Sequence, residues 1–380
     1  MRKILYITGT RADYGLMRSV LREIESHPRL ELEIAATGMH LMEEFGRTIE
    51  EVKKDGFKIH EIDATYEKDD KESMLNFIGK FIQLLAKKIE EINPDIILLL
   101  GDRGEMLAGA IVGAYLTIPT AHLHGGEVTS TVDELARHAI TKLAHIHLPP
   151  TEKSAERIIK MGEDPLNVFV VGPPGIDSIL NENLIEPTEL SKKYDLELSK
   201  PILLLLQHPV TTDAEDAPAH IRETLEAIVE LRHQTIAIYP NADAGGREII
   251  EVIKEYEKYP FIKMFKSIPH KEYLSLMKIA SVMVGNSSSG IIEAPSFGLP
   301  AINIGSRQEG RERAENVIDV DYDKEQIKAA IKKALDDENF KGKVKNCKSP
   351  YGDGGVGVRI TDILSEIKID KKILQKRLTY

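Results

Sequence analysis

The sequence predicts an α/β protein with parallel, doubly wound sheets in two domains. Short apolar runs alternate along the chain with amphipathic helical patterns, which is typical of parallel sheets covered by helices. A turn cluster at Gly172–Gly175 and a polar stretch from Asn181 to Lys200 interrupt the alternation, which restarts at Pro201. Because 380 residues are too many for one typical core, we expect two α/β halves of similar size with a cleft between them.

Apolar runs in the first half predict seven short strands. These are Lys3–Thr8, Leu30–Thr37, Phe57–Ile62, Ile96–Leu100, a run near Pro119 that ends at His122, Ile146–Leu148 and Val168–Val171. Apolar residues at helical spacing follow the first strand, and a second helix is expected between Gly38 and about Lys54. A long amphipathic helix is predicted over Asp69–Glu91, before the stop signal Asn93-Pro94-Asp95.

The second half repeats the pattern. Strands are predicted at Pro201–Leu206, Thr235–Tyr239, Phe261–Phe265, Ser281–Val284 and Ala301–Ile304. After Asp321 the pattern is mainly helical and rich in Lys and Glu.

Composition excludes several classes of protein. A net charge of −11 argues against a general nucleic-acid-binding surface, so any anion site must be a local pocket of positive charge. The single cysteine, Cys347, leaves no internal disulfide and fits a reducing compartment. The N-terminus does not resemble a signal peptide, and no apolar run approaches the roughly 20 residues that span a bilayer. We therefore expect a cytoplasmic protein that binds neither nucleic acid nor membrane.

Acidic residues and histidines gather where two apolar runs of the first half end. One run is followed by GDRGE at 101–105, and the next by HLHGGE at 122–127. The carboxyl ends of parallel strands share the edge of the sheet where ligands bind. The carboxylates here are candidates for general acid or base catalysis, although each alone is as readily a helix cap or a surface group. They are Asp102, Glu105, Glu127, Asp133 and Glu134.

The best candidate for an anion site lies in the second half, at 285–290 (GNSSSG). Small residues allow close approach of the backbone, and serine hydroxyls before a predicted helix add donors. The same serines also fit a plain helix cap. Glu293 can accept hydrogen bonds from a sugar diol, while Arg307, Arg311 and, in the first half, Arg11 can neutralise phosphate. The segment Gly9–Gly15 after the first strand is not a GxGxxG dinucleotide fingerprint. The chain also has no GxxxxGK[ST] loop, which weakens ATPase and kinase interpretations.

Metal binding is a further alternative, because five of the twelve histidines fall between His122 and His147. The His-x-His pair at 122 and 124 can place two imidazoles on one face of a strand. Yet the chain has no HExxH motif and no cysteine nearby. We expect no metal and no other cofactor, and assign packing or hydrogen-bonding roles to His138, His145 and His147.

Taken together, these segments resemble the hydrolysing UDP-N-acetylglucosamine 2-epimerases of sialic-acid-type sugar synthesis, which are related to the epimerase half of the bifunctional animal enzyme. The resemblance runs in order through GTRADYG (9–15), ATGMHL (36–41), GDR (101–103), HLHGGE (122–127), TVDELARHAITKLAH (131–145), QHPVTTD (207–213), PNADAGG (240–246), GNSSSGIIE (285–293) and GSRQEGRERAENV (305–317). Non-hydrolysing relatives typically carry Pro-Glu after the first GTR. This chain has Ala12-Asp13-Tyr14 instead, which favours the hydrolysing branch.

The resemblance implies a glycosyltransferase-B type fold, with two Rossmann-like domains whose parallel sheets face a central cleft. We place these domains at residues 1–172 and 173–355, and expect a C-terminal helix within 356–380 to cross back to the first domain. The first domain would act on the sugar and the second would hold UDP. By analogy, the nucleotide sugar would be bound by Ser287, Ser288, Glu293, Asn241, His208 and Arg307, with Arg11 and Arg103 reaching across from the first domain.

The implied reaction converts UDP-N-acetylglucosamine and water to N-acetylmannosamine and UDP by elimination and then hydration. Asp102 and Asp133 match the family's acid/base positions, and His208 matches a histidine assigned to the nucleotide or leaving group. One departure concerns the base: many members read His-x-Glu-Gly-Gly where this chain has His124 in place of the glutamate. An imidazole still exchanges protons near pH 7, so we retain His124 and Glu127 as catalytic candidates.

Other interpretations stay open. The departure at His124 is compatible with another sugar, such as a UDP-2,4-diacetamido-trideoxyhexose of legionaminic-acid-type synthesis, and a non-hydrolysing epimerase is a further alternative. A retaining glycosyltransferase can share the fold, because fold alone does not determine function. A nucleotide-sugar sensor would tolerate loss of Asp102 and Asp133, yet both are present. The family precedent is a homo-oligomer, either a dimer or a tetramer.

Overall fold

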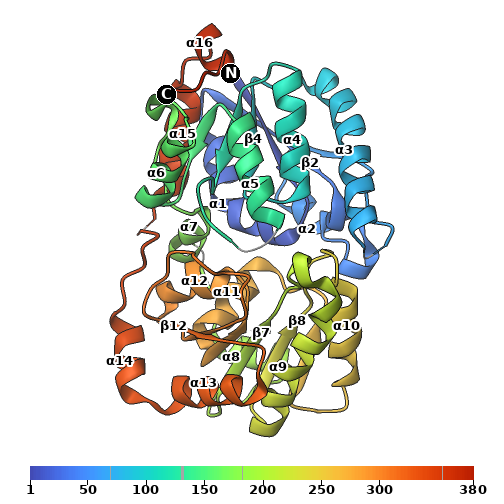
Figure 1. Ribbon diagram of the computed structural model, residues 1–380, viewed down its shortest axis with the longest axis vertical. Helices are drawn as coiled ribbons and strands as arrows, with labels where there is room; N and C mark the ends of the chain where they lie inside the picture. Colours follow the sequence, from blue (N-terminus) through green and yellow to red (C-terminus); the bar gives the residue numbers. More distant parts are fainter. Residues whose placement is uncertain (69, 130–131, 182, 353) are drawn as a thin grey trace.

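The computed structural model describes residues 1–68, 70–129, 132–181, 183–352 and 354–380. Within these residues the strands form two six-stranded sheets, and every pairing between neighbouring strands is parallel. Figure 1 shows the two halves of the chain stacked along the long axis of the molecule, each with helices around its sheet. The predicted α/β class with two parallel sheets is therefore confirmed.

The first sheet has the strand order β3-β2-β1-β4-β5-β6. Its strands are β1 (Arg2–Thr8), β2 (Leu30–Ala36), β3 (Ile59–Glu61), β4 (Ile96–Leu100), β5 (Thr120–Leu123) and β6 (Ile146–Leu148). The helices of this half are α1 (Arg11–Ser26), α2 (Ile49–Lys54), α3 (Lys71–Ile92), α4 (Gly104–Tyr115), α5 (Val132–Leu143), α6 (Glu152–Lys160) and α7 (Pro174–Asn181). Short 3₁₀ turns occur at Gly38–Leu41, Glu43–Phe45 and Pro165–Asn167.

The second sheet has the order β12-β11-β10-β7-β8-β9, which is the same doubly wound topology. Its strands are β7 (Ile202–Leu206), β8 (Gln234–Ile238), β9 (Ile262–Phe265), β10 (Val282–Gly285), β11 (Ala301–Ile304) and β12 (Val317–Val320). The helices are α8 (Pro187–Tyr194), α9 (Ala217–Leu231), α10 (Gly246–Glu255), α11 (His270–Ile279), α12 (Ser289–Ile292), α13 (Lys324–Asp336) and α14 (Glu338–Asn346). 3₁₀ turns occur at Thr211–Asp216 and Ala294–Phe297.

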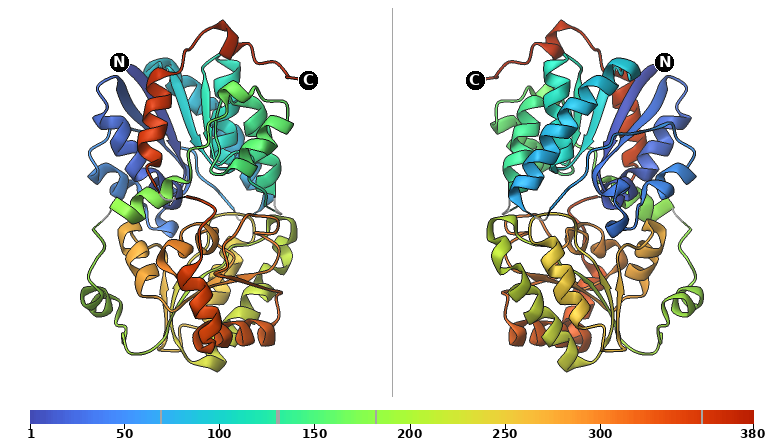
Figure 2. Two further views of the ribbon diagram at one scale, coloured as in Figure 1. Left: turned by 90° about the vertical axis from the view of Figure 1, so that its left-hand side faces the viewer. Right: turned by 90° about the vertical axis from the view of Figure 1, so that its right-hand side faces the viewer.

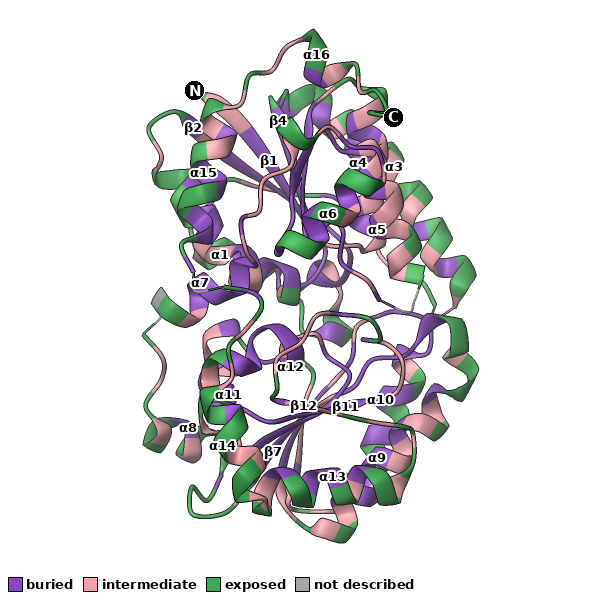
Figure 3. Cartoon of the chain, turned by 60° about the vertical axis from the view of Figure 1, so that its left-hand side comes forward, coloured by how far each residue is buried: buried purple, intermediate pink, exposed green. Residues whose placement is uncertain are grey.

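Both faces of each sheet are covered. In β1, Ile4 and Tyr6 pack with α1 on one face, while Leu5 and Ile7 pack with α3 and α4 on the other, as the two-residue period of a strand requires. Burial on both faces explains why β4 reads as an uninterrupted apolar run. Figure 3 shows the buried strands inside each half, with exposed residues mainly on the outer faces of the helices.

The C-terminal segment lies with the first half. Two helices, α15 (Val356–Glu366) and α16 (Lys371–Leu374), occupy the region 356–380, where one C-terminal helix is predicted. Val356, Ile360, Leu364 and Ile373 join the core around α1, and the red segment lies beside the first half in Figures 1 and 2. The domain limits at residues 172 and 355 stay a prediction.

Two predicted elements were wrong in detail, and one strand was not predicted. Val168–Val171 is not a strand: it makes one isolated bridge, His147 to Val168, and then turns away towards α7. The helix expected between Gly38 and Lys54 is two 3₁₀ turns and the short α2, because Gly46 adopts φ 90° and breaks the segment. The sequence also gave no signal for β12, whose half-buried side chains do not form an apolar run. Among the described helices, none combines the length and apolar character needed to cross a membrane.

Candidate active site

Two cavities lie between the carboxyl edges of the two sheets. One, of about 150 Å³, is lined mainly by loops of the first half, and the other, of about 170 Å³, mainly by loops of the second. They share five lining residues, namely Ala12, Leu16, Asn241, Ser288 and Arg307, so they are two parts of one cleft. The first contains Asp102, Arg103, His124, Glu127 and Asp133. The second contains Arg11, His208, Ser287 and Glu293. All twelve predicted site residues therefore line this cleft.

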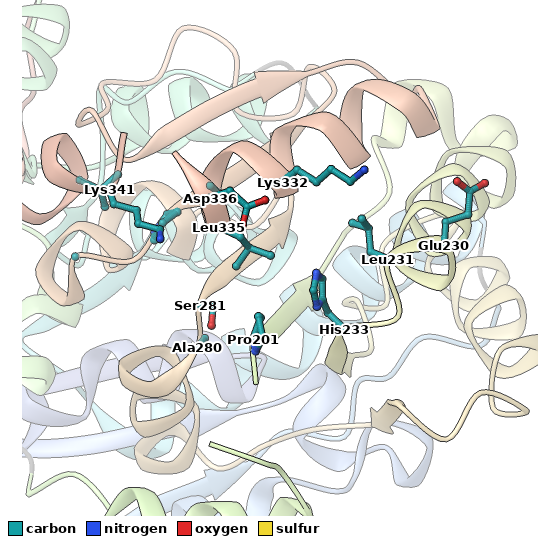
Figure 4. A pocket seen from close by; sticks show the side chains of 14 residues that line it. Pro201, Glu230, Leu231, His233, Ala280, Ser281, Lys332, Leu335, Asp336 and Lys341 are labelled. Atoms are coloured by element: carbon teal, nitrogen blue, oxygen red, sulfur yellow. The ribbon is translucent and has the colours of Figure 1, made fainter. Parts of the chain in front are cut away.

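A larger cavity, of about 700 Å³, lies elsewhere. Figure 4 shows Pro201, Ala280 and Ser281 on its wall, and these residues directly precede β7 and β10. The cavity thus lies at the amino ends of the strands, whereas the cleft lies at their carboxyl ends. None of the predicted site residues lines it, so the cleft, although smaller, is the better candidate for the active site.

Asp102 and Arg103 occupy the turn between β4 and α4. The carboxylate of Asp102 accepts a hydrogen bond from Arg137 of α5, a buried arginine to which sequence reasoning gave no role. Arg103 donates to Oδ1 of Asp243 in the second half at 3.0 Å, and its Nε lies 3.3 Å from the carboxylate of Glu105. Arg103 therefore reaches across the cleft as expected, but here it pairs with an acidic side chain.

His124 follows β5 and has a backbone φ of 61°, which is uncommon for a residue with a side chain. Its Nδ1 lies 2.8 Å from Oε2 of Glu127. Nη2 of Arg311 donates to the same oxygen at 2.9 Å, and the hydroxyl of Tyr351 donates to Oε1 at 3.3 Å. Burial alone raises the pKa of Glu127, but Arg311 and His124 outweigh it and lower this pKa to about 2. Glu127 is thus an ionised carboxylate that orients His124.

His208 has the opposite hydrogen-bonding arrangement. The backbone N–H of Asn241 donates to Nδ1 of His208 at 3.3 Å, so the proton of the neutral ring belongs on Nε2. Burial and the charge of Arg307 lower the pKa of His208 to about 3, which keeps the ring neutral. The side chain of Asn286 fixes the backbone of His208 on both sides, accepting from its N–H at 2.7 Å and donating to its carbonyl at 2.9 Å.

The predicted anion segment lies directly after β10. Gly285 has a φ of 126°, and a Cβ atom there would lie 2.1 Å from the carbonyl oxygen of Leu206, so the turn requires glycine. Ser287 and Ser288 follow at the start of α12 and line the cleft. Arg307 donates to the carbonyl of Asn286 at 3.2 Å, which holds a guanidinium next to the serines.

The remaining predicted residues are also in the cleft. Arg11 opens α1, and burial lowers the pKa of its guanidinium. Glu293 directly follows α12 and is buried, which raises the pKa of its carboxyl. Asp133, in the first turn of α5, lies 4.0 Å from Nη2 of Arg307. The cleft thus places Asp102, Asp133 and His124 in the first cavity and the serine hydroxyls with His208 in the second, while Arg307 lines both.

The three histidines expected to have packing or hydrogen-bonding roles have such partners. His138 bonds to Glu134 at 3.3 Å, His145 accepts from the backbone of Thr120 at 3.2 Å, and His147 bonds to Glu163 at 3.0 Å. Across the described ranges, no group of three or more His, Cys, Asp or Glu side chains has an arrangement suited to a metal ion.

Comparison with known proteins identifies the family. Residues 22–365 match the family model described as UDP-N-acetylglucosamine 2-epimerase. The chain is 42% identical to a UDP-N,N'-diacetylbacillosamine 2-epimerase (hydrolyzing) of Legionella pneumophila, over 100% of both chains. It is 37% identical to a UDP-N-acetylglucosamine 2-epimerase of Neisseria meningitidis, over 90% of this chain and 91% of that one.

Solved structures support the fold. The crystal structure of the UDP-GlcNAc 2-epimerase from Neisseria meningitidis bound to UDP-GlcNAc superposes with a TM-score of 0.79, covering 95% of this chain and 99% of that one at 19% identity. The two facing Rossmann-like sheets have the glycosyltransferase-B type arrangement that the motifs implied. By sequence and by fold, the chain belongs to the UDP-N-acetylglucosamine 2-epimerase family.

Proposed function

We propose that this chain is a hydrolysing UDP-sugar 2-epimerase, which releases UDP and a free 2-acetamido sugar inverted at C2. The observation that carries the proposal is the division of the cleft. Asp102, His124 and Asp133 come from the first half, while Ser287, Ser288 and His208 come from the second. A nucleotide sugar that spans the two cavities would have its reacting carbons near the acid/base groups and its diphosphate near the donors.

The second half is suited to the departure of UDP from C1. The diphosphate gains negative charge as the C1–O bond breaks, and donors fixed before the reaction stabilise that charge. Arg307 and the hydroxyls of Ser287 and Ser288 can supply them. His208 carries its ring proton on Nε2, so it can donate a hydrogen bond to a phosphate oxygen without first being charged.

The first half is suited to proton transfer at C2. Inversion requires one group to remove the C2 proton as UDP leaves, and a second group to return a proton to the other face after water adds at C1. Asp102 and His124 line the same cavity, and Asp133 stands nearby on α5. Because Nδ1 of His124 is held by Glu127, its Nε2 is the acceptor available to a ligand. We assign Glu127 the role of orienting His124.

The substrate is the finer part of the proposal. The family and the Neisseria relative favour UDP-N-acetylglucosamine, with N-acetylmannosamine as the product. The Legionella relative matches over its full length at higher identity, and its name specifies UDP-N,N'-diacetylbacillosamine. The histidine at position 124 is compatible with either sugar. We therefore propose a UDP-linked 2-acetamido sugar as the substrate class, with these two compounds as the candidates.

Product identification in deuterated water tests the proposal. The enzyme is incubated with each candidate UDP-sugar, and the products are identified by NMR and mass spectrometry. Release of UDP and a free sugar that carries deuterium at C2 is the expected result. Recovery of an epimerised but intact UDP-sugar would instead identify a non-hydrolysing epimerase. Transfer of the sugar to an added acceptor would indicate a glycosyltransferase, and tight binding without turnover would indicate a sensor.

Two further expectations concern the protein in the cell. The cytoplasmic location and the dimer or tetramer expected from the family remain predictions. Light scattering at several protein concentrations measures the oligomeric state directly.

A further inference from the structure

Arg137 is the largest fully buried side chain of the described residues, with an exposed fraction of 1%. It projects from α5 to the wall of the first cavity. Nη2 donates to Oδ2 of Asp102, while Nη1 donates to the backbone carbonyl of Glu127 at 3.1 Å and to Oγ1 of Thr129 at 3.2 Å. One guanidinium therefore connects the loop after β4 with the loop after β5.

The positive charge of Arg137 is in an unfavourable environment. Burial, together with the positive charges of Arg311 and Arg307, lowers the pKa of Arg137 well below its usual range. An arginine does not lose its proton in a protein, so Arg137 stays charged in this buried position. A buried charge of this kind needs a carboxylate partner. Asp102, whose side chain is 22% exposed, provides one at the border of the cavity.

We propose that Arg137 is a positioning residue for the epimerase reaction, which holds Asp102 as an oriented carboxylate and fixes it relative to the His124–Glu127 pair. This inference rests on the proposed function. With Oδ2 bound to Arg137, Oδ1 has no hydrogen-bond partner in the described part of the chain and is available to exchange a proton with the substrate. The bond from Nη1 to the Glu127 carbonyl sets the loop that carries His124.

The planar guanidinium is essential to this role. It offers separate N–H groups to Asp102 and to the Glu127 carbonyl at fixed angles, whereas a lysine ammonium concentrates its donors at one point. Lysine at position 137 therefore retains the charge beside Asp102 but cannot hold both loops in one geometry. Glutamine removes the charge altogether. Comparing the two substitutions thus separates the effect of Arg137 on the ionisation of Asp102 from its effect on the orientation of Asp102.

The test compares R137K and R137Q with the wild-type enzyme. For R137Q we expect kcat to fall at least 100-fold, with KM changed less than threefold, and the acid limb of the kcat pH profile to move up by at least one pH unit. For R137K we expect kcat to fall about tenfold with the acid limb unmoved. R157M is the matched control, because Arg157 donates to the same loop after β5, at the Gly126 carbonyl 3.0 Å away, but does not contact Asp102. Its kcat should change less than threefold.

A measurement without turnover keeps this inference separate from the proposed function. The carboxyl carbon of Asp102 is titrated by NMR in protein labelled with ¹³C-aspartate, and D102N assigns its signal. An upward shift of at least one pH unit in R137Q supports the inference, even if no UDP-sugar tested is turned over. An unmoved titration in folded R137Q overturns it. If R137Q does not fold, R137K provides the test. A kcat of R137K equal to that of the wild type overturns the positioning role. A tenfold lower kcat, with the acid limb of the pH profile unmoved, supports it.

Discussion

The Nδ1 atom of His124 lies 2.8 Å from Oε2 of Glu127, and this contact determines which ring nitrogen faces the ligand. Glu127 is ionised, so it can only accept, and the proton of the neutral ring belongs on Nδ1. His208, which accepts from the backbone of Asn241 at Nδ1, has the other tautomer. The cleft therefore contains one imidazole ready to accept a proton and one ready to donate a hydrogen bond. This difference fits a reaction that removes a proton at C2 and stabilises negative charge on the leaving group.

The first prediction is chemical rescue of H124G. Glycine accepts the φ of 61° found at position 124, so the loop should keep its shape when the imidazole is removed. We expect kcat to fall by about 100-fold or more, in line with the loss of a general base. Added imidazole should raise the kcat of H124G at least tenfold. The activity of D102N should not respond to imidazole, while both variants should still bind UDP. A folded H124G protein that imidazole does not rescue would remove His124 from proton transfer.

The second prediction concerns Arg307. Its guanidinium lines both cavities and is fixed by the Asn286 carbonyl at 3.2 Å. A hydrogen bond to a charged group contributes about 1.5–3 kcal/mol, so R307M should bind UDP roughly 10- to 100-fold more weakly. Calorimetric titration with UDP measures this directly. R313M is the control, because Arg313 belongs to the same loop but pairs with Asp319 and lines neither cavity. Equal losses of affinity in the two variants would contradict the assignment.

Sequence patterns predicted most of the fold because the strands are buried on both faces. β4 and β7 are continuous apolar runs, which cannot be mistaken for half-exposed strands. β12 was not predicted, because its side chains are only partly buried and include an aspartate. Val168–Val171 was wrongly predicted as a strand because it is apolar. The neighbouring strand β6 has only three residues, and the chain turns away after a single bridge to it.

The site could be predicted only to the level of strand ends. The rule that ligands bind at the carboxyl ends of parallel strands located Asp102, His124 and Ser287 without any coordinates. The partners that give these residues their properties could not be located in this way. Arg137 is a helix residue 35 positions from Asp102, and Tyr351 is 224 positions from Glu127. Only the tertiary structure brings such residues together, so tautomers and charge states were beyond sequence reasoning.

The third prediction tests the turn after β10. In G285A the new Cβ atom would lie 2.1 Å from the Leu206 carbonyl oxygen, and a φ of 126° is unfavourable for alanine. Backbone atoms cannot move aside as a flexible side chain can. We expect the free energy of unfolding to drop by about 2–4 kcal/mol, and UDP affinity to fall with it. G342A is the control, because nothing lies within 4 Å of a Cβ placed at Gly342, a residue inside α14. It should be neutral or stabilising by up to about 1 kcal/mol in urea denaturation.

The fourth prediction concerns the C-terminal segment, which is attached to the first half by a buried ion pair. Lys376 lies 2.5 Å from Glu163, a carboxylate with an exposed fraction of 1%. The same ammonium donates to the carbonyls of Thr141, Lys142 and Ala144 at 2.6–2.8 Å, at the end of α5. K376M should therefore lower the free energy of unfolding at pH 7 by about 2 kcal/mol. K372M, which alters an exposed lysine of α16, should leave it unchanged.

The pH dependence of stability distinguishes this ion pair from simple packing. Burial alone raises the pKa of Glu163, but hydrogen bonds from His147, Lys142 and Lys376 outweigh it and lower this pKa to about 2. A carboxyl whose pKa is lower in the folded state stabilises the fold above its unfolded pKa of roughly 4.5, and loses that effect as pH falls towards 2. We expect the wild type to lose about 2 kcal/mol from this group between pH 5 and pH 2.5, and K376M to lose clearly less. Urea denaturation followed by circular dichroism across this range measures the difference, and parallel curves for the two proteins would contradict the role given to Lys376.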